Sequence, residues 1–271
     1  MRVIATGTYG GSPARVGLWW LEQSSPPPGL ERLRSLVSES EAERARRLAR
    51  AVHRERFLDS HVFLRLVLAE QTGIPPNALR FASAPCTRCG EAHGKPYLEG
   101  SGVRFNLAHG ERTTVVAVSR DAEVGVDVAE RTAVEREPDL GRLASSLHPR
   151  EAAAVARAGA DGIGAARGAF LRIWARKEAV AKAVGAGLTV PLADYDTTGT
   201  TALCSGERVV VADVSLPVDA ACAVAACVPA GAAPAVEVDV HDGAALVHRA
   251  CEGGTGARPR LGRVDVLVPS R

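Results

Sequence analysis

The hydrophobic pattern of the chain changes between strand-like and helical twice. Residues 38–68 carry apolar side chains at helical spacing among charged ones, which predicts a helix that Ser38 or Ser40 can cap. Two shorter helical patterns, at 146–158 and 169–184, lie on either side of a glycine-rich break. Runs of β-branched residues between turn residues predict strands at 1–22 (one or two strands), 103–107, 113–119, 124–128, 208–215, 220–228 and 236–240.

Helices followed by strands therefore occur in both halves of the chain. This order predicts an α+β fold of two similar lobes that meet near residue 120. We expect an N-terminal lobe at residues 1–120, a C-terminal lobe at 121–250 and a tail at 251–271. A chain of 271 residues is long enough to give two modest domains a buried core each.

Composition and charge narrow the class of protein without identifying it. Hydrophobic residues make up 46% and charged residues 24%, as in ordinary soluble globular proteins. The net charge of +2 is too small to indicate a nucleic-acid binder, and no apolar run approaches the ~20 residues of a membrane helix. The first residues do not follow a signal-peptide pattern, so we expect a cytoplasmic protein with reduced cysteines.

Lysine is rare in this chain, and its positions are informative. Three of the 33 basic residues are lysines, namely Lys95, Lys177 and Lys182. Because arginine is so strongly favoured elsewhere, a retained lysine indicates a position that needs a compact ammonium group. Trp174, Glu178 and Lys182 recur every four residues, so they share one face of the predicted helix. A simple surface ion pair between Glu178 and Lys182 is the ordinary alternative.

The strand end GVDVAE, at residues 125–130, is a candidate metal site. Alternation along a strand directs Val126 and Val128 to the core and Asp127 to the opposite face. A carboxylate at the end of an apolar strand suits a hard cation such as Mg²⁺. An aspartate that merely ends a strand in a turn is the simpler alternative.

Two further segments carry groups that can bind anions. In residues 93–110, Lys95 projects from a Gly-Lys-Pro turn and His109 lies near a strand end, where a structural hydrogen bond is the more ordinary role. The first predicted helix carries a basic stripe, with Arg56 beside it, formed by Arg44, Arg47, Arg50 and Arg54. Such a stripe is either a solvated face or a surface that binds phosphates or an acidic partner.

Together, these motifs resemble the signature of the 4′-phosphopantetheinyl transferases. That signature is a Gly-Ile/Val-Asp-Ile/Val-Glu strand followed by a Trp-x-x-Lys-Glu-Ala/Ser-x-x-Lys-x-x-Gly-x-Gly-Leu helix, and GVDVAE and WARKEAVAKAVGAGL match it at residues 125–130 and 174–188. The chain length and the upstream GKP and FNLAH segments are similar to the larger, surfactin-synthetase-type branch. The resemblance covers roughly residues 35–230 and implies a pseudo-dimer of two α+β lobes with the active site between them.

The resemblance implies a Mg²⁺-dependent enzyme that moves the 4′-phosphopantetheine group of coenzyme A to a serine of an apo acyl or peptidyl carrier protein, releasing 3′,5′-ADP. It implies that Asp127 and Glu178 bind Mg²⁺, and that Lys182 contacts the attacked phosphate. Glu178, or a water that it positions, is then the expected general base. The residues expected to hold the nucleotide end of coenzyme A are Arg56, Lys95 and His109, with Arg44 as a second basic contact.

The chain departs from the family pattern at two positions. Ala129 stands where many members have a glutamate, and the next residue, Glu130, faces the other way on a regular strand. Either a bulge redirects Glu130, or a water takes the vacant metal position, which we favour. Ala108 stands before His109 where serine is common, which removes one phosphate hydrogen bond.

The missing acid motivates an alternative function, a non-catalytic homologue that binds coenzyme A or a carrier protein. A Mg²⁺-dependent hydrolase of pyrophosphates is a more distant alternative. Cys86, Cys89 and His93 have zinc-like spacing but lack a fourth ligand. Because two lobes of one chain can form the cleft, we expect a monomer that binds neither nucleic acid nor membrane; fatty-acid, polyketide and nonribosomal-peptide carriers all remain open as partners.

Overall fold

Groups of strands and groups of α-helices follow one another along the chain in the computed structural model, which describes residues 2–5, 12–85, 90–92, 94–135, 137, 139–229, 231 and 234–253. The strands are β1 (Arg2–Ala5), β2 (Ala14–Glu22), β3 (Phe81–Ser83), β4 (Pro96–Leu98), β5 (Arg104–His109), β6 (Thr113–Ser119), β7 (Val124–Glu130), β8 (Thr201–Cys204), β9 (Glu207–Val214), β10 (Ala220–Cys227) and β11 (Val236–Asp242). The α-helices are α1 (Glu39–Arg46), α2 (Ala51–Thr72), α3 (Thr132–Glu135), α4 (Leu140–Ala144), α5 (Pro149–Ala158), α6 (Ile163–Val184) and α7 (Gly243–Cys251). The predicted α+β class is therefore confirmed. No helix in the described part of the chain is long and apolar enough to cross a bilayer.

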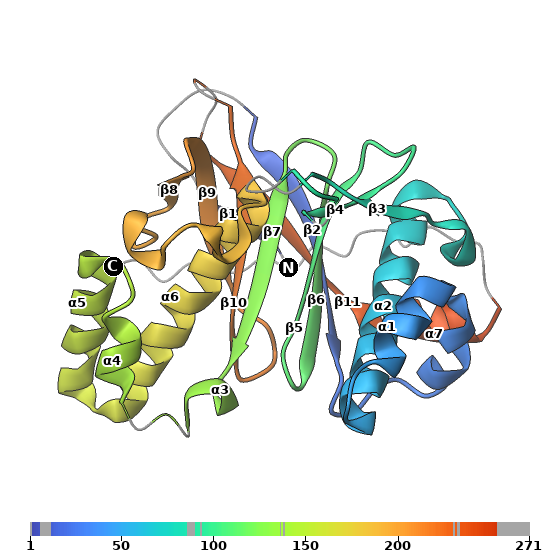
Figure 1. Ribbon diagram of the computed structural model, residues 1–271, viewed down its shortest axis with the longest axis horizontal. Helices are drawn as coiled ribbons and strands as arrows, with labels where there is room; N and C mark the ends of the chain where they lie inside the picture. Colours follow the sequence, from blue (N-terminus) through green and yellow to red (C-terminus); the bar gives the residue numbers. More distant parts are fainter. Residues whose placement is uncertain are drawn as a thin grey trace.

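Two sheets form the middle of the molecule, and helices cover their outer faces (Figure 1). The strand orders are β1-β11-β2-β6-β5 and β7-β10-β9-β8. Aliphatic side chains from both sheets pack together between them, among them Leu18, Val115, Val126 and Val224. Helices α2 and α7 pack on the first sheet, and α5 and α6 on the second, each over a separate apolar cluster. The result is a helix–sheet–sheet–helix arrangement.

The two halves share a local strand order, since β2-β6-β5 in the first sheet corresponds to β7-β10-β9 in the second. Each half also has a helix of 22 residues, α2 or α6, that ends at a glycine in the left-handed conformation, Gly73 or Gly185. The pseudo-dimer and the lobe boundaries stay predictions. However, β11 pairs in parallel with β2, so this late strand lies in the sheet of the first half and not with its sequence neighbours.

The predicted single helix at 38–68 is wrong, because the structure contains two helices, α1 and α2, with a joint at residues 47–50. Ser38 caps α1 as expected, and its capping box with Glu41 is complete. Arg54 donates to the carbonyl oxygens of Leu48 and Ala49 in the joint. The joint folds α1 back against α2, so tertiary contacts override the good helix propensity of this sequence. Consequently, the predicted basic stripe does not lie along one helix.

In the second half, the elements α3, α4, α7 and β8 were not predicted, and both predicted helices begin at other residues. Helix α5 begins at Pro149 with His148 as its cap, and not at Ser146. Helix α6 begins after Gly162, so most of the predicted glycine-rich break is helical. Burial of Ala166 and Phe170 against the C-terminal core outweighs the ~1 kcal/mol helix cost of each glycine. The predicted loop at 81–102 contains the short pair β3 and β4, whereas the other predicted strands are confirmed within two residues at either end.

Candidate functional site

Helix α6 crosses β7 at very close range, and Gly125 permits the approach. A Cβ atom at Gly125 would overlap the carbonyl oxygen of Ala179 and the amide nitrogen of Ala183. Side chains of a strand alternate, so Asp127 lies on the same face of β7 and is directed toward α6. The strand and the helix thereby bring together the two motifs that the sequence singled out.

At this crossing, Lys182 of α6 binds Asp127 of β7. The Nζ atom of Lys182 lies 2.6 Å from Oδ1 of Asp127 and donates to the carbonyl oxygen of Val126 at 3.3 Å. The pKa of Asp127 is raised to about 6, chiefly by burial and also by the negative charge of Glu178, although the Lys182 ammonium lowers it. Glu178 is half-buried and lies one helical turn before Lys182. Lys182 therefore pairs with Asp127, and the negative charge of Glu178 also acts on that carboxylate.

This donor set fits a magnesium ion. Among the described residues, no cluster of three or more His, Cys, Asp and Glu side chains could hold a metal ion. Mg²⁺ does not need one, because it commonly binds through one or two carboxylates and completes its shell with water and substrate phosphates. The two carboxylates of Asp127 and Glu178 also exceed the single positive charge of Lys182, and a cation would balance them.

Glu130 is not a third ligand beside Asp127. Its carboxylate is buried and accepts hydrogen bonds from the amide nitrogens of Glu111 at 3.0 Å and Arg112 at 2.8 Å. Strand β7 pairs with β10 one residue for one residue from Val124 to Glu130. The bulge alternative is therefore wrong, and Glu130 stabilises the β5–β6 turn instead. Ala129 is buried in the core beneath α6, and a water at the vacant metal position stays a prediction.

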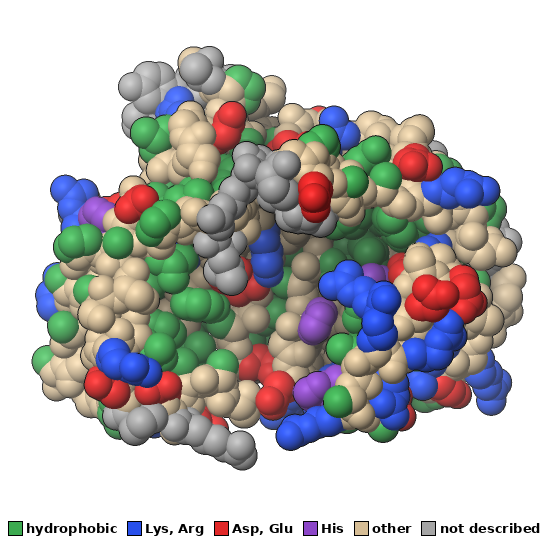
Figure 2. Space-filling model, in the orientation of Figure 1, with side chains coloured by type: hydrophobic (Ala, Val, Ile, Leu, Met, Phe, Trp, Pro, Cys, Tyr) green, Lys and Arg blue, Asp and Glu red, His purple; other side chains and the backbone are tan. Residues whose placement is uncertain are grey.

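A large basic groove holds three of the four residues expected to bind the nucleotide. Its volume is about 1320 Å³, and Arg44, Arg56 and His109 line it. Figure 2 shows histidine and basic side chains gathered beside a hollow in this face of the molecule. The other basic or histidine side chains in its lining are Arg47, His53, His61, Arg65 and Arg80. An anion of several charges would find complementary groups here.

His109 links this groove to the site at the crossing. Its ring is exposed to solvent but lies inside the concave groove, and this partial desolvation lowers the pKa of His109. Positive charges on His61, Lys182 and Arg44 lower it further. The influence of Lys182 means that the groove and the Asp127 site share one electrostatic environment.

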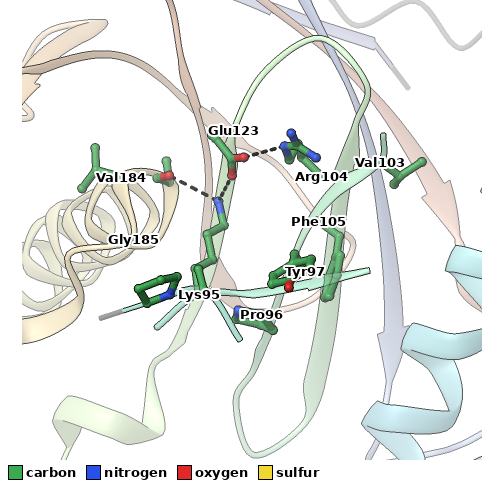
Figure 3. A pocket seen from close by; sticks show the side chains of 12 residues that line it. Lys95, Pro96, Tyr97, Val103, Arg104, Phe105, Glu123, Val184 and Gly185 are labelled. Carbon is green, nitrogen blue, oxygen red and sulfur yellow. Dashed lines mark hydrogen bonds and ion pairs between the residues drawn. The ribbon is translucent and has the colours of Figure 1, made fainter. Parts of the chain in front are cut away.

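Lys95 lies apart from the other predicted nucleotide contacts. It lines a smaller pocket of about 340 Å³ together with Tyr97 and Phe105 (Figure 3). Its Nζ atom donates to Oε2 of Glu123 at 2.8 Å, and also to the carbonyl oxygens of Val124 at 2.8 Å and Ala183 at 3.2 Å. All three donors of the ammonium group are therefore used. Binding of a phosphate by Lys95 stays a prediction and would require it to exchange a partner.

Sequence reasoning missed a charged network in the groove wall. Glu41 lies 2.8 Å from Nδ1 of His61 and 2.6 Å from Nη2 of Arg65, and the ring of His61 stacks on Phe57. The guanidinium of Arg44 lies over the same Phe57 ring, 5.5 Å from its centre. The sequence pattern marked only Ser38 or Ser40, as caps of this helix, and did not mark Glu41. Its partners lie on another helix, and no local pattern marks them.

Comparison with known proteins identifies the family of this chain. The family model of the 4′-phosphopantetheinyl transferase superfamily matches residues 123–205, which contain β7 and α6. The 4′-phosphopantetheinyl transferase HetI of Nostoc sp. is 30% identical over 178 residues, which cover 64% of this chain and 70% of HetI. The Synechocystis sp. protein slr0495, provisionally named a 4′-phosphopantetheinyl transferase, is 29% identical over 176 residues, or 63% of this chain and 65% of that protein. Cys86, Cys89 and His93 lie outside the described residues. The matched region and the relatives show that this chain belongs to the 4′-phosphopantetheinyl transferase superfamily.

Proposed function

We propose that the protein transfers the 4′-phosphopantetheine group of coenzyme A to a serine of an apo acyl or peptidyl carrier protein and releases 3′,5′-ADP. Membership of the superfamily supports the general transfer reaction. The observation that carries the proposal is the contact of Lys182 with Asp127 beside Glu178, next to a basic groove. These groups suit a reaction in which negative charge on phosphoryl oxygens must be held and neutralised.

The groove supplies the binding energy for coenzyme A in this proposal. Arg44 and Arg56 offer guanidinium groups, which match phosphate oxygens in charge and geometry. His109 becomes a stronger donor when an arriving phosphate favours its protonated form. The same basic surface attracts an acidic carrier protein and orients it toward the groove.

At the crossing, the serine oxygen bonds to the β-phosphorus of coenzyme A, and the bond from that phosphorus to the oxygen of the leaving 3′,5′-ADP breaks. Glu178, directly or through a water, accepts the serine proton. Lys182 places its ammonium beside the attacked phosphate and neutralises charge there. Asp127 and Glu178 would hold Mg²⁺, which when bound supplies electrostatic stabilisation of the pyrophosphate.

Intact-mass spectrometry of apo carrier proteins tests this proposal. Fatty-acid, polyketide and nonribosomal-peptide carriers are incubated with the protein, coenzyme A and Mg²⁺. We expect a carrier to gain one phosphopantetheine unit, and Glu178→Gln to abolish the gain. Glu70→Gln is a matched control because Glu70 lies on the other long helix, α2, near Arg249. We expect this control to load the carrier at the wild-type rate.

Other outcomes separate the alternatives. Coenzyme A binding without any mass gain across the carriers would favour the non-catalytic homologue. Release of free phosphopantetheine without carrier loading would favour the hydrolase. Mass gain that is unaffected by Glu178→Gln would reject the roles assigned to the site.

A further inference from the structure

Lys177, the direct neighbour of Glu178, points away from the groove into a fully buried site. Its Nζ atom lies 2.8 Å from Oε2 of Glu151 in α5, and neither side chain is exposed. It also donates to the carbonyl oxygens of Leu192 and Tyr195, both at 2.6 Å. The ammonium lies 3.9 Å from the centre of the Tyr195 ring. Four contacts therefore anchor this side chain.

The first half of the molecule repeats this arrangement around Arg65. Arg65 is buried, its Nη2 atom lies 2.6 Å from Oε2 of Glu41, and it donates to the carbonyl oxygens of Pro76 and Leu79. Its guanidinium lies 5.0 Å from the centre of the Phe81 ring. A capping-box glutamate, two loop carbonyls and an aromatic ring thus surround a buried cation in both halves.

The two cations occupy the same position in their helices. Arg65 lies eight residues before Gly73, and Lys177 lies eight residues before Gly185, the two left-handed caps. The residue directly after the buried cation differs between the two halves. Leu66, after Arg65, is buried in a hydrophobic core, whereas Glu178, after Lys177, lies at the crossing of α6 and β7. The same frame therefore supports packing in one half and the candidate site in the other.

We propose that the Lys177–Glu151 ion pair is a positioning device that sets the rotation of α6 about its axis, so that Glu178 and Lys182 face Asp127. This inference rests on the proposed function of that site. Neighbouring residues of a helix point about 100° apart, so anchoring Lys177 determines the direction of Glu178. The close contact at Gly125 limits how near α6 lies to β7, and the anchored Lys177 holds the opposite side of the crossing to α5.

Small rotations matter for this chemistry. A reacting group misplaced by ~1 Å can lose ~100-fold in rate, even when the change lies outside the reacting groups. Loss of the anchor is therefore expected to lower kcat. It should leave the KM for coenzyme A nearly unchanged, because the basic groove is lined mainly by α1, α2, residues 77–83 and β5, and not by α6.

The test uses the double variant Glu151→Gln/Lys177→Met. Removing Lys177 alone would leave a buried carboxylate unpaired, which is strongly destabilising, whereas replacing both charges by uncharged groups of similar volume is often tolerated. In the wild type, Oε1 of Glu151 accepts hydrogen bonds from the amide and the hydroxyl of Thr197, both at 2.7 Å. The side-chain oxygen of glutamine can still accept these two hydrogen bonds. Arg172→Met is the matched control, because it removes an exposed cation from the same helix.

Three measurements are made on each variant: thermal unfolding, carrier-loading kinetics, and NMR of protein labelled with carbon-13 at the lysine ε carbon. The chain has three lysines, so the wild-type spectrum holds three signals and that of the double variant holds two. A Lys182→Arg variant assigns the signal that reports the contact with Asp127. We expect the folded double variant to show a kcat at least ~10-fold lower, a coenzyme A KM within about threefold, and a moved Lys182 signal. The control should match wild type in all three.

A double variant with wild-type kcat and an unmoved Lys182 signal would overturn the inference and leave the pair a role in folding alone. Failure of the wild-type protein to load any carrier would reject the proposed function instead. In that case the Lys182 signal still decides the positioning claim, because it reports the contact between α6 and β7 without turnover. An unmoved signal would again overturn it.

Discussion

Replacing Glu41 by glutamine should destabilise the protein strongly at neutral pH and weakly in acid. Burial raises the pKa of Glu41, but hydrogen bonds from His61, Arg65 and the amide of Ser38 lower it more, from 4.5 to about 2. At 1.36 kcal/mol for each pKa unit, this difference is worth about 3 kcal/mol of folding free energy. Glu41→Gln keeps the shape of the side chain and removes the charge that Arg65 requires.

The sign of the pH dependence follows from the lowered pKa. A carboxyl group with a folded pKa below its unfolded value contributes its full stability above about pH 4.5 and loses it as the pH falls toward 2. The free energy of unfolding of Glu41→Gln should therefore lie about 3 kcal/mol below that of wild type at pH 7. The gap should narrow steadily from pH 5 to pH 3.

Urea unfolding at pH 7, 5, 4 and 3 measures this gap. Glu39→Gln is the control, because Glu39 lies on the same helix and both side chains of its ion pair with Arg46 are exposed to solvent. An exposed pair of this kind contributes little, so this variant should unfold within ~0.5 kcal/mol of wild type. A gap for Glu41→Gln below ~1 kcal/mol at pH 7, or one that stays constant down to pH 3, would refute the reasoning.

Three further variants test the geometry of the site. Gly125→Ala should push α6 from β7, cost about 1–3 kcal/mol of stability and lower kcat ~100-fold, as measured by urea unfolding and carrier loading; wild-type kcat would contradict the close-packing argument. Glu130→Gln should lose about 1–3 kcal/mol from the β5–β6 turn, yet require the same Mg²⁺ concentration for half-maximal transfer; a raised requirement would make Glu130 a ligand after all. His109→Gln should remove a pH dependence of the coenzyme A KM. In wild type, affinity should fall as the pH rises through the pKa of His109, which lies below its ordinary 6.5, and an unchanged profile in the variant would exclude His109 from phosphate binding.

Local patterns were sufficient for much of the fold and for the core of the site. Valine alternation predicted β6 and β7 because a strand side chain has only two faces to choose from. The spacing of Glu178 and Lys182 placed both on one face of a helix, and that face does meet Asp127. The strand alternation and the helix spacing involve residues close together in the chain, so backbone geometry alone determines them, whereas the contact with Asp127 required the tertiary fold.

Local patterns gave wrong helix boundaries where tertiary packing opposed the local helix propensity. The sequence between α1 and α2 favours a continuous helix, but the chain turns there so that Glu41 can reach His61 and Arg65. The glycine-rich stretch before residue 169 suggested a break, but α6 continues through it because its apolar face is buried. In both places the energy of packing exceeds a propensity difference of about 1 kcal/mol.

The sequence by itself determined which residues share a face and which types of group the site contains. The tertiary structure decided which charge pairs with which, and those decisions separate a binding group from a structural one. Lys95 and Lys177 carry the same charge as Lys182, yet one is held by Glu123 and two carbonyls, and the other is buried against Glu151. The reason is physical: an ammonium group pairs with whichever acceptors the fold brings within about 3 Å, and these come from segments far apart in the chain.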